Sequence, residues 1–317
     1  MIIGVAWAWL SEAMPNGPDS LTEMRRLIDT HARPDLGSSV AGLLLSKVAG
    51  AHSPDYSLTE PLLVVMAQGG KRLLLGDEVF EYRSAQYLIV AASVPVTGHY
   101  LDTTASHPSL AMGLVLRPAV LSTLMLQAPA ESVSRAAAPA IATGDACPEL
   151  LDAVARMLRL LEHPADAPVL GPLIEQEILW RLLTGRHGST VRQIGTADSY
   201  LAHINRAIAW MRDNYAEPVR IEQLAKMAGM SASAFHRQFR GVTAMSPLQF
   251  QKRIRLQNAR SLLLTQPGDI AGVGHRVGYD SPSQFNREYR RMFGTPPGQD
   301  AAQLRAVGSA TEATGFP

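Results

Sequence analysis

Two sets of polar residues with the same spacing occur in the last third of the 317-residue chain. The first set is Ser233, His236, Arg237 and Arg240, and the second set, 50 residues later, is Ser283, Asn286, Arg287 and Arg290. Residues three, four and seven positions apart lie on one face of an α-helix. Arginine can donate two hydrogen bonds to guanine, asparagine suits adenine, and serine or histidine can meet base edges or phosphates. Each set therefore has the residue types and spacing of a helix that reads DNA.

The opposite face of each predicted helix carries an aromatic pair that would anchor it in a core. Phe235 and Phe239 lie four residues apart in the first copy, as do Phe285 and Tyr289 in the second. One polar face alone is usually only a solvated surface. Because both copies share both faces, we favour two DNA-binding helices over two solvated ones.

A short apolar helix and a glycine turn precede each of these helices, as in a helix-turn-helix motif. Gly229 and Gly278 allow the tight turns, and Ser231 and Ser281 offer hydroxyl groups that cap the next helices. Close crossing of the paired helices requires a small residue at positions 225 and 274. The apolar positions of the short helices are Ile221, Leu224, Ala225 and Ala228 in the first copy and Ile270, Val273, Gly274 and Val277 in the second.

A helix that begins at Ser246-Pro247 is predicted to hold the two motifs at a fixed separation. Rigid spacing matters because two recognition helices can enter successive major grooves only if they stand about 34 Å apart. This helix carries the cations Lys252, Arg253 and Arg255. We give equal weight to contact of these cations with phosphates and to simple solvation of the helix.

Basic charge is concentrated in the same part of the chain. Residues 199–300 hold 14 Lys and Arg against 7 Asp and Glu, whereas residues 1–198 hold 14 against 20. The overall net charge of +1 thus conceals one segment of +7 and another of −6. A positive segment of this size fits a polyanionic partner such as double-stranded DNA.

Residues 61–117 have the pattern of short strands separated by turns, which indicates a small antiparallel barrel or sandwich. An apolar run that stops at Gln68-Gly69-Gly70 predicts a hairpin around the glycines. A later run alternates as a half-buried strand does, at Leu110, Met112, Leu114 and Leu116. Two helices predicted after Pro148 either form a partner interface or cover the barrel.

These patterns divide the chain into five parts. We predict an N-terminal appendage at 1–30, a cupin-like effector or dimerisation domain at 31–184, a linker at 185–198, the double motif at 199–300 and a disordered tail at 301–317. The first ten residues are apolar, but no Lys or Arg precedes Arg25, which argues against a secretory signal. Because no uncharged run of about 20 residues is present, we expect no membrane-spanning helix and a cytoplasmic protein.

Residues 200–297 closely resemble the DNA-binding domain of the AraC/XylS family of bacterial transcriptional regulators. The resemblance is carried by LAKMAGMSASAFHRQFRGVTAMSPLQFQKRIRLQNARSLLL and VGYDSPSQFNREYRRMFGTPP. It implies a sequence-specific transcription activator that binds promoter DNA and contacts RNA polymerase. It also places Ser233, His236, Arg237, Ser283, Gln284, Asn286 and Arg287 at base-reading positions. The full predicted set of DNA contacts adds Ser231, Arg240, Lys252, Arg253, Ser281 and Arg290.

The segment PLLVVMAQGGKRLLLGDEVFEYRSAQYLIVAASVPVTG resembles the cupin-type effector domain of one AraC subgroup. This implies an α+β chain, in which an antiparallel β-barrel with flanking helices precedes an all-α domain with two helix-turn-helix motifs. A small-molecule effector and a second copy of the chain are further partners that the resemblance implies. Gly272 and Gly274 depart from the family pattern, and we expect each to weaken its helix by about 1 kcal/mol relative to alanine.

A metal-dependent cupin enzyme carrying a DNA-binding module is the alternative function. Such an enzyme needs a His-x-His pair with further ligands, whereas His52, His99 and His107 do not have that spacing. Cys147 stands before Pro148 in an Ala-rich loop, with neither a helix start nor a histidine to activate it. We therefore predict no catalytic residue, metal or cofactor. A third alternative is an architectural DNA-binding protein that takes no effector.

Overall fold

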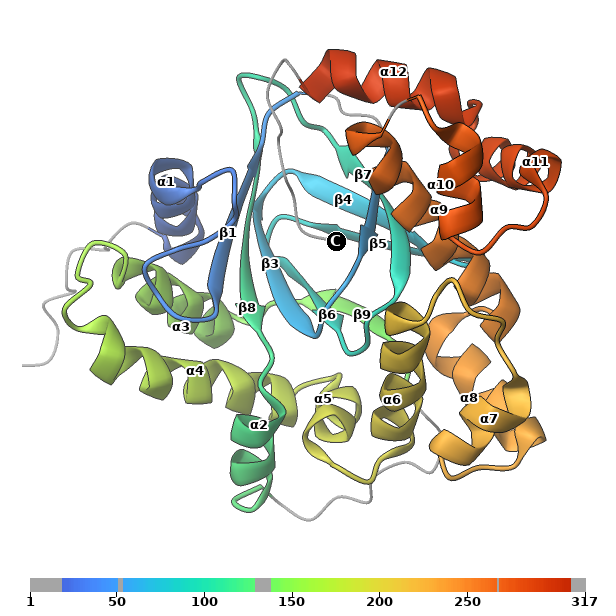
Figure 1. Cartoon of the computed structure of the whole chain (residues 1–317). Helices are drawn as coiled ribbons and strands as arrows, with labels where there is room; N and C mark the ends of the chain where they lie inside the picture. The colour runs from blue at the N-terminus through green and yellow to red at the C-terminus, as the bar shows by residue number, and fades with distance from the viewer. Residues whose placement is uncertain (1–18, 51–53, 129–137, 267, 309–317) are drawn as a thin grey trace, which may run out of the picture.

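The computed structural model of the chain describes residues 19–50, 54–128, 138–266 and 268–308. An N-terminal β-domain of two antiparallel sheets has helices on one side and an all-helical C-terminal domain on the other (Figure 1). This arrangement confirms the predicted α+β fold class. The apolar first ten residues, on which the argument against a secretory signal rests, lie outside the described residues.

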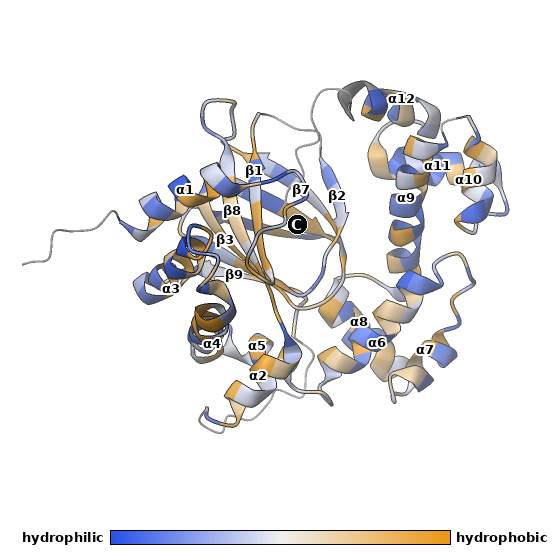
Figure 2. Cartoon of the chain, turned by 60° about the vertical axis from the view of Figure 1, so that its left-hand side comes forward, coloured by the Kyte–Doolittle hydropathy of each residue, from blue (hydrophilic) through white to orange (hydrophobic). Residues whose placement is uncertain are grey.

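Two sheets face each other in the β-domain. The first has the order β1-β8-β3-β6-β9, with β1 Leu43–Val48, β8 Ser109–Val115, β3 Leu62–Gln68, β6 Gln86–Val90 and β9 Ile141–Asp145. The second has the order β2-β7-β4-β5, with β2 Asp55–Leu58, β7 Pro95–Leu101, β4 Gly70–Leu75 and β5 Glu78–Arg83. Apolar residues are concentrated on the strands, as Figure 2 shows, so the interior between the sheets is the core of this domain.

The predicted hairpin at Gly69 is wrong. Strand β3 pairs with β6 and β8, whereas β4 pairs with β5 and β7. Gly69 has a φ of +80°, which an L side chain rarely adopts, and it carries the chain from one sheet into the other. A turn signal marks a change of direction but does not specify which strand becomes the new neighbour.

Strand β8 is buried on both faces rather than on one. Residues 109–114 are all buried because α1 (Ser20–His31) packs against β1, β3 and β8. In α1, Met24, Leu27 and Ile28 are completely buried, and the Arg25 Nε–H donates a 2.9 Å hydrogen bond to the Ala67 carbonyl. The described part of the predicted appendage is therefore a core helix of the β-domain.

Helices α2 (Pro118–Met125), α3 (Pro148–Arg159), α4 (Ala167–Thr184) and α5 (Gly188–Gly195) follow the strands. Helix α3 packs against α1 and α4, whereas α4 leaves Val169 68% and Leu173 59% exposed. The choice between a covering role and a partner interface therefore stays open for α4. Helix α5 lies inside the predicted linker and is buried, with Val191 fully covered, so that segment is folded.

The C-terminal domain contains seven helices among the described residues. They are α6 Tyr200–Asp213, α7 Ile221–Met227, α8 Ala232–Thr243, α9 Pro247–Thr265, α10 Ile270–Arg276, α11 Pro282–Phe293 and α12 Pro297–Gly308. In α12, Asp300 and Ala301 are buried. The predicted disordered tail is thus helical up to residue 308, and its remainder, 309–317, lies outside the described residues.

The two halves of the C-terminal domain have different cores. One apolar cluster runs without a break from the β-domain through α6, α7 and α8 into the first half of α9. A second, smaller cluster joins the rest of α9 to α10, α11 and α12. Within the parts of the chain that the structure describes, no helix has both the length and the apolar character needed to cross a bilayer.

The β-domain contacts the C-terminal ends of both α8 and α11. The Ala140 N–H donates a 2.9 Å hydrogen bond to the Val242 carbonyl at the end of α8. At the end of α11, the ring of Tyr56 in β2 lies 4.7 Å from the ring of Phe293. Arg260 in α9 lies 4.8 Å from the centre of the same Tyr56 ring. Both halves of the helical domain are therefore docked on the β-domain.

Candidate nucleic-acid interface

Helix α8 has the two faces that its sequence predicts. Gly229 adopts a φ of +66° in the preceding turn, and the Ser231 hydroxyl accepts a 3.3 Å hydrogen bond from the Ala234 N–H as N-cap. Phe235 and Phe239 are completely buried. The opposite face is exposed and consists of Ser233, His236, Arg237 and Arg240.

Helix α11 repeats this construction 50 residues later. Gly278 adopts a φ of +89°, and the Ser281 hydroxyl accepts a 3.4 Å hydrogen bond from the Gln284 N–H. Phe285 and Tyr289 are completely buried. The exposed face consists of Ser283, Gln284, Asn286, Arg287 and Arg290. The two capping serines also lie within hydrogen-bond distance of Ser233 and Ser283.

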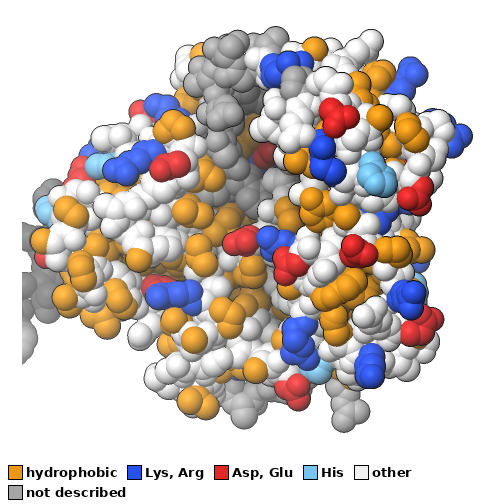
Figure 3. Space-filling model, in the orientation of Figure 1, with side chains coloured by type: hydrophobic (Ala, Val, Ile, Leu, Met, Phe, Trp, Pro, Cys, Tyr) orange, Lys and Arg blue, Asp and Glu red, His pale blue; other side chains and the backbone are white. Residues whose placement is uncertain are grey.

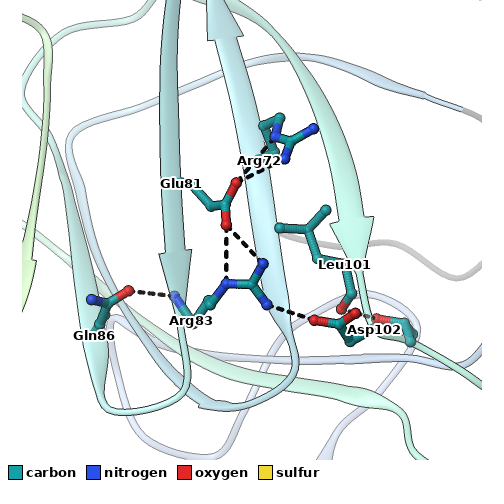
Figure 4. Close-up of polar contacts among 7 residues, drawn as sticks. Arg72, Glu81, Arg83, Gln86, Leu101 and Asp102 are labelled. Carbon is teal, nitrogen blue, oxygen red and sulfur yellow. Dashed lines mark hydrogen bonds and ion pairs between the residues drawn. The ribbon is translucent and has the colours of Figure 1, made fainter.

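The arginines on these faces are free to meet a partner. Within the described ranges, the side chains of Arg237, Arg240, Arg287 and Arg290 form no hydrogen bond or ion pair. The exposed arginines Arg72 and Arg83 of the β-domain differ, because both form ion pairs with Glu81 (Figure 4). Arg83 also forms an ion pair with Asp102. Figure 3 shows Lys and Arg side chains spaced along the right-hand side, over the C-terminal helices. Available positive charge is thus present on both recognition helices.

Two of the predicted DNA contacts meet an acidic residue that sequence reasoning missed. The Glu288 carboxylate accepts hydrogen bonds from Lys252 Nζ at 2.8 Å, from Tyr279 Oη at 2.9 Å and from Gln284 Nε2 at 3.2 Å. Burial raises the pKa of Glu288, but these donors outweigh that effect and hold the pKa below its ordinary value. Lys252 and Gln284 must therefore leave or share Glu288 in order to bind DNA.

The Arg255 side chain is neither solvated nor free to contact phosphates. Its guanidinium donates to the carbonyls of Tyr215 at 2.7 Å, Ala216 at 2.8 Å and Gly278 at 2.7 Å. The first two carbonyls follow α6, and the third belongs to the turn of the second motif. Gln251, one turn earlier, also donates to Tyr215 and Glu217. These two side chains fasten the segment between α6 and α7 to α9, and Arg255 also fastens the turn of the second motif.

Close neighbours explain why the second motif has glycine at positions 272 and 274. A Cβ on Gly274 would lie 3.0 Å from the ring of Phe285, as the predicted close crossing of α10 and α11 requires. A Cβ on Gly272 would lie 2.1 Å from the carboxylate of Asp269, which caps α10. The expectation that alanine would strengthen this helix at both positions leaves out these contacts.

Arg253 lies apart from the exposed recognition faces. It lines a pocket between the β-domain and helices α9 and α11, together with His99 of β7. It is half-buried there, so the predicted contact of Arg253 with DNA does not agree with its position when the domains are docked.

The metal site that the alternative enzyme needs would lie in the β-domain. Among described residues, no group of three His, Cys, Asp or Glu side chains is placed to hold a metal ion, and His52 is not described. Cys147 is exposed and is the N-cap residue of α3, which corrects the expectation that it stands away from a helix start.

Two family models match the chain. The model described as "AraC-type transcriptional regulator N-terminus" matches residues 39–190, and the model described as "Helix-turn-helix domain" matches residues 224–303. The HTH-type transcriptional activator RhaS of Salmonella paratyphi A (strain ATCC 9150 / SARB42) is 29% identical over 149 residues. That match covers 47% of this chain and 53% of RhaS, so the chain spans about half the length of the curated relatives it matches.

Solved structures show similarity at two levels. The crystal structure of ToxT from Vibrio cholerae O395 is 8% identical, with a TM-score of 0.51 over 83% of this chain and 97% of ToxT; this likeness concerns the fold alone. The DNA-binding domain of AdpA, solved in complex with a target DNA, is 31% identical. That comparison covers 34% of this chain and 97% of the AdpA domain, with a TM-score of 0.32.

Proposed function

Because the chain belongs to the AraC family of transcriptional regulators, we propose that it binds promoter DNA through α8 and α11 and activates transcription in response to an effector. The family consists of regulators and not of enzymes, so the cupin-enzyme alternative is set aside. Activation and contact with RNA polymerase are proposed by analogy with RhaS, which is named a transcriptional activator.

The observation that carries the DNA-binding proposal is the repeated exposed face with unpaired arginines. In this proposal Ser233, His236 and Arg237 read bases from α8, and Ser283, Gln284, Asn286 and Arg287 read bases from α11. Arg240 and Arg290, one turn further along, contact phosphates. The clamp formed by Arg255 supports this proposal because it ties the segment that leads into the first motif to the turn of the second motif.

The base-reading role is tested with Arg237→Ala and Arg287→Ala. Each variant should lose about 1–3 kcal/mol of binding free energy and relax the preference at one or two base pairs. Footprinting and quantitative gel-shift measurements on the same operator check both effects. Arg276→Ala is the matched control, because Arg276 is an exposed arginine of α10 that pairs with Asp269 and lies outside the predicted set. Unchanged footprints for both variants would remove these arginines from base reading.

Lys252→Ala tests the phosphate-contact role. It should weaken binding evenly across sequences and reduce the slope of log K against log salt by about one unit. A loss confined to one operator would contradict this assignment.

The effector response is proposed to pass through the N-terminal domain. Its support is the apolar core that continues from the β-domain into the first motif, since a change in one part then repacks the other. Genomic footprinting with and without candidate inducers tests the response. A footprint that no inducer alters would favour the ligand-free architectural alternative.

A further inference from the structure

The Gln284 amide on the exposed face of α11 is held by a carboxylate of the same helix. Its Nε2 donates a 3.2 Å hydrogen bond to Oε1 of Glu288, one turn further along. The side chains of Asn286 and Arg287, which lie on the same exposed face, form no hydrogen bond with any residue that the structure describes. Gln284 therefore meets a partner in an orientation that is already set within the protein.

Glu288 is itself fixed by two other elements. Lys252 Nζ on α9 donates to Oε1 at 2.8 Å, and Tyr279 Oη in the turn before α11 donates to Oε2 at 2.9 Å. Tyr279 is buried, and its ring lies 5.4 Å from the ring of Phe285. Polar side chains one turn apart commonly meet on a helix surface. Here the contacts from outside the helix also hold the carboxylate in one place.

An ionised carboxylate decides which end of an amide faces it, because it accepts hydrogen bonds and donates none. Although burial raises the pKa of Glu288, its three donors hold the pKa below the ordinary value, so the group is ionised at neutral pH. The nitrogen of Gln284 must therefore point toward Glu288, since the amide oxygen would be repelled. Nε2 has a second N–H group, which stays available together with Oε1.

The orientation of a glutamine amide determines which purine it reads in the major groove. Adenine presents N7, an acceptor, beside the N6 donor, and an amide matches both with one N–H group and its oxygen. Guanine presents the acceptor O6 where adenine presents N6. An amide turned end for end would place its nitrogen opposite O6 and accept guanine more readily. We propose that Glu288 is a positioning residue, which fixes the Gln284 amide so that the second motif reads adenine and rejects guanine.

The first motif lacks this pair, although the two motifs otherwise share their construction. The positions 50 residues before Gln284 and Glu288 hold Ala234 and Gln238. Two helices with the same caps and the same buried rings can then prefer different bases. This proposal rests on the proposed function, because it requires α11 to lie in a major groove, and it specifies one of the base contacts.

Binding to duplexes that differ at one base pair tests the proposal. The full chain selects an operator from a library of random duplexes, and Gln284→Ala identifies the base pair whose preference depends on Gln284. The parent chain should have adenine at that pair and bind the guanine variant about tenfold more weakly. In Glu288→Gln this ratio should fall to about threefold or less, because the new amide can face either end of Gln284.

The Gln284→Ala background separates positioning from a direct or a structural role. Glu288→Gln should leave the ratio unchanged in that background, since Glu288 acts through Gln284. Glu222→Gln is the matched control, because it removes one exposed acid from the first motif and should also leave the ratio unchanged. Tyr279→Phe keeps the buried ring and deletes one donor to Glu288. It should lower the ratio by a smaller factor, and it remains a test if Glu288→Gln does not fold.

An unchanged ratio in folded Glu288→Gln overturns the proposal, as does a change that persists in the Gln284→Ala background. A base other than adenine at the identified pair overturns it as well. A parent chain with no preference at any base pair is a failure of the proposed function. A parent chain that reads its operator equally well without Gln284 is a failure of this inference alone.

Discussion

Removal of the Arg255 side chain should release the segment that leads into the first motif from the turn of the second motif. Arg255→Met keeps much of the aliphatic stem and deletes the group that donates to the carbonyls of Tyr215, Ala216 and Gly278. Each hydrogen bond contributes about 1 kcal/mol net, and more where a charged donor serves a buried acceptor. Because the guanidinium is only half-buried, water can replace part of the lost contacts. The expected loss in the free energy of unfolding is about 3 kcal/mol in total.

Urea unfolding followed by far-UV circular dichroism measures this loss. Lys252→Met is the matched control, since it removes a cation from the same helix that forms one ion pair with Glu288 and is exposed. That change should cost no more than about 1 kcal/mol. If Arg255→Met unfolds within about 1 kcal/mol of the parent chain, or equals Lys252→Met, then Arg255 does not hold the motifs together.

The same variant should change DNA binding in a specific way. When the relative position of α8 and α11 is no longer fixed, the second motif gains less from the binding of the first. Affinity for the whole operator should therefore fall, while affinity for a half-operator stays close to that of the parent. Equal losses on both fragments would indicate general damage and contradict the clamp.

Two further predictions concern the second motif. Gly274→Ala should destabilise the chain by about 1–2 kcal/mol, because its Cβ would crowd the ring of Phe285. Gly272→Ala should change stability by less than about 1 kcal/mol, since better helix propensity offsets disturbance of the cap. Thermal melts that rank the two variants in the reverse order would refute the steric argument. Glu288 has a lowered pKa in the folded chain, so its stabilisation is complete above the ordinary glutamate pKa and disappears as the pH falls through the lowered value. The stability advantage of the parent over Glu288→Gln, measured by urea midpoints, should therefore shrink between about pH 5 and pH 3; an advantage that grows on acidification would contradict the sign.

The recognition faces could be predicted because the information is local and occurs twice. Caps, glycine turns and aromatic pairs lie within one turn of the residues they position, as Ser231 and Phe235 illustrate. The role of Arg255 could not be predicted in this way, since its partners lie 23 to 40 residues away. Glu288 was missed because it lies on the same helix as the arginines, where a carboxylate reads only as a compensating charge.

Three segments of the N-terminal half were predicted wrongly from the sequence, each for a different physical reason. Helix α1 does carry a signal, because Met24, Leu27 and Ile28 lie at helical spacing, but apolar residues before it suggested an appendage. Helix α5 has a polar composition and buries Thr190, Arg192 and Gln193 along with Val191, so no periodic apolar pattern marks it. The turn at Gly69 would look the same in a hairpin and at a corner between sheets.

Attachment to the β-domain at the C-terminal ends of α8 and α11 makes each motif a lever, because buried rings such as Phe235 and Phe285 hold each helix to the rest of its motif. A 12-residue helix such as α8 is about 18 Å long, so a tilt of about 5° at the attached end displaces the other end by about 1.6 Å. Hydrogen bonds to bases tolerate only about 0.5 Å, and the N-terminal residues of a recognition helix are the ones that reach the bases. A shift of a few degrees where Val242 and Phe293 meet the β-domain is thus enough to retune operator affinity while the domains remain attached.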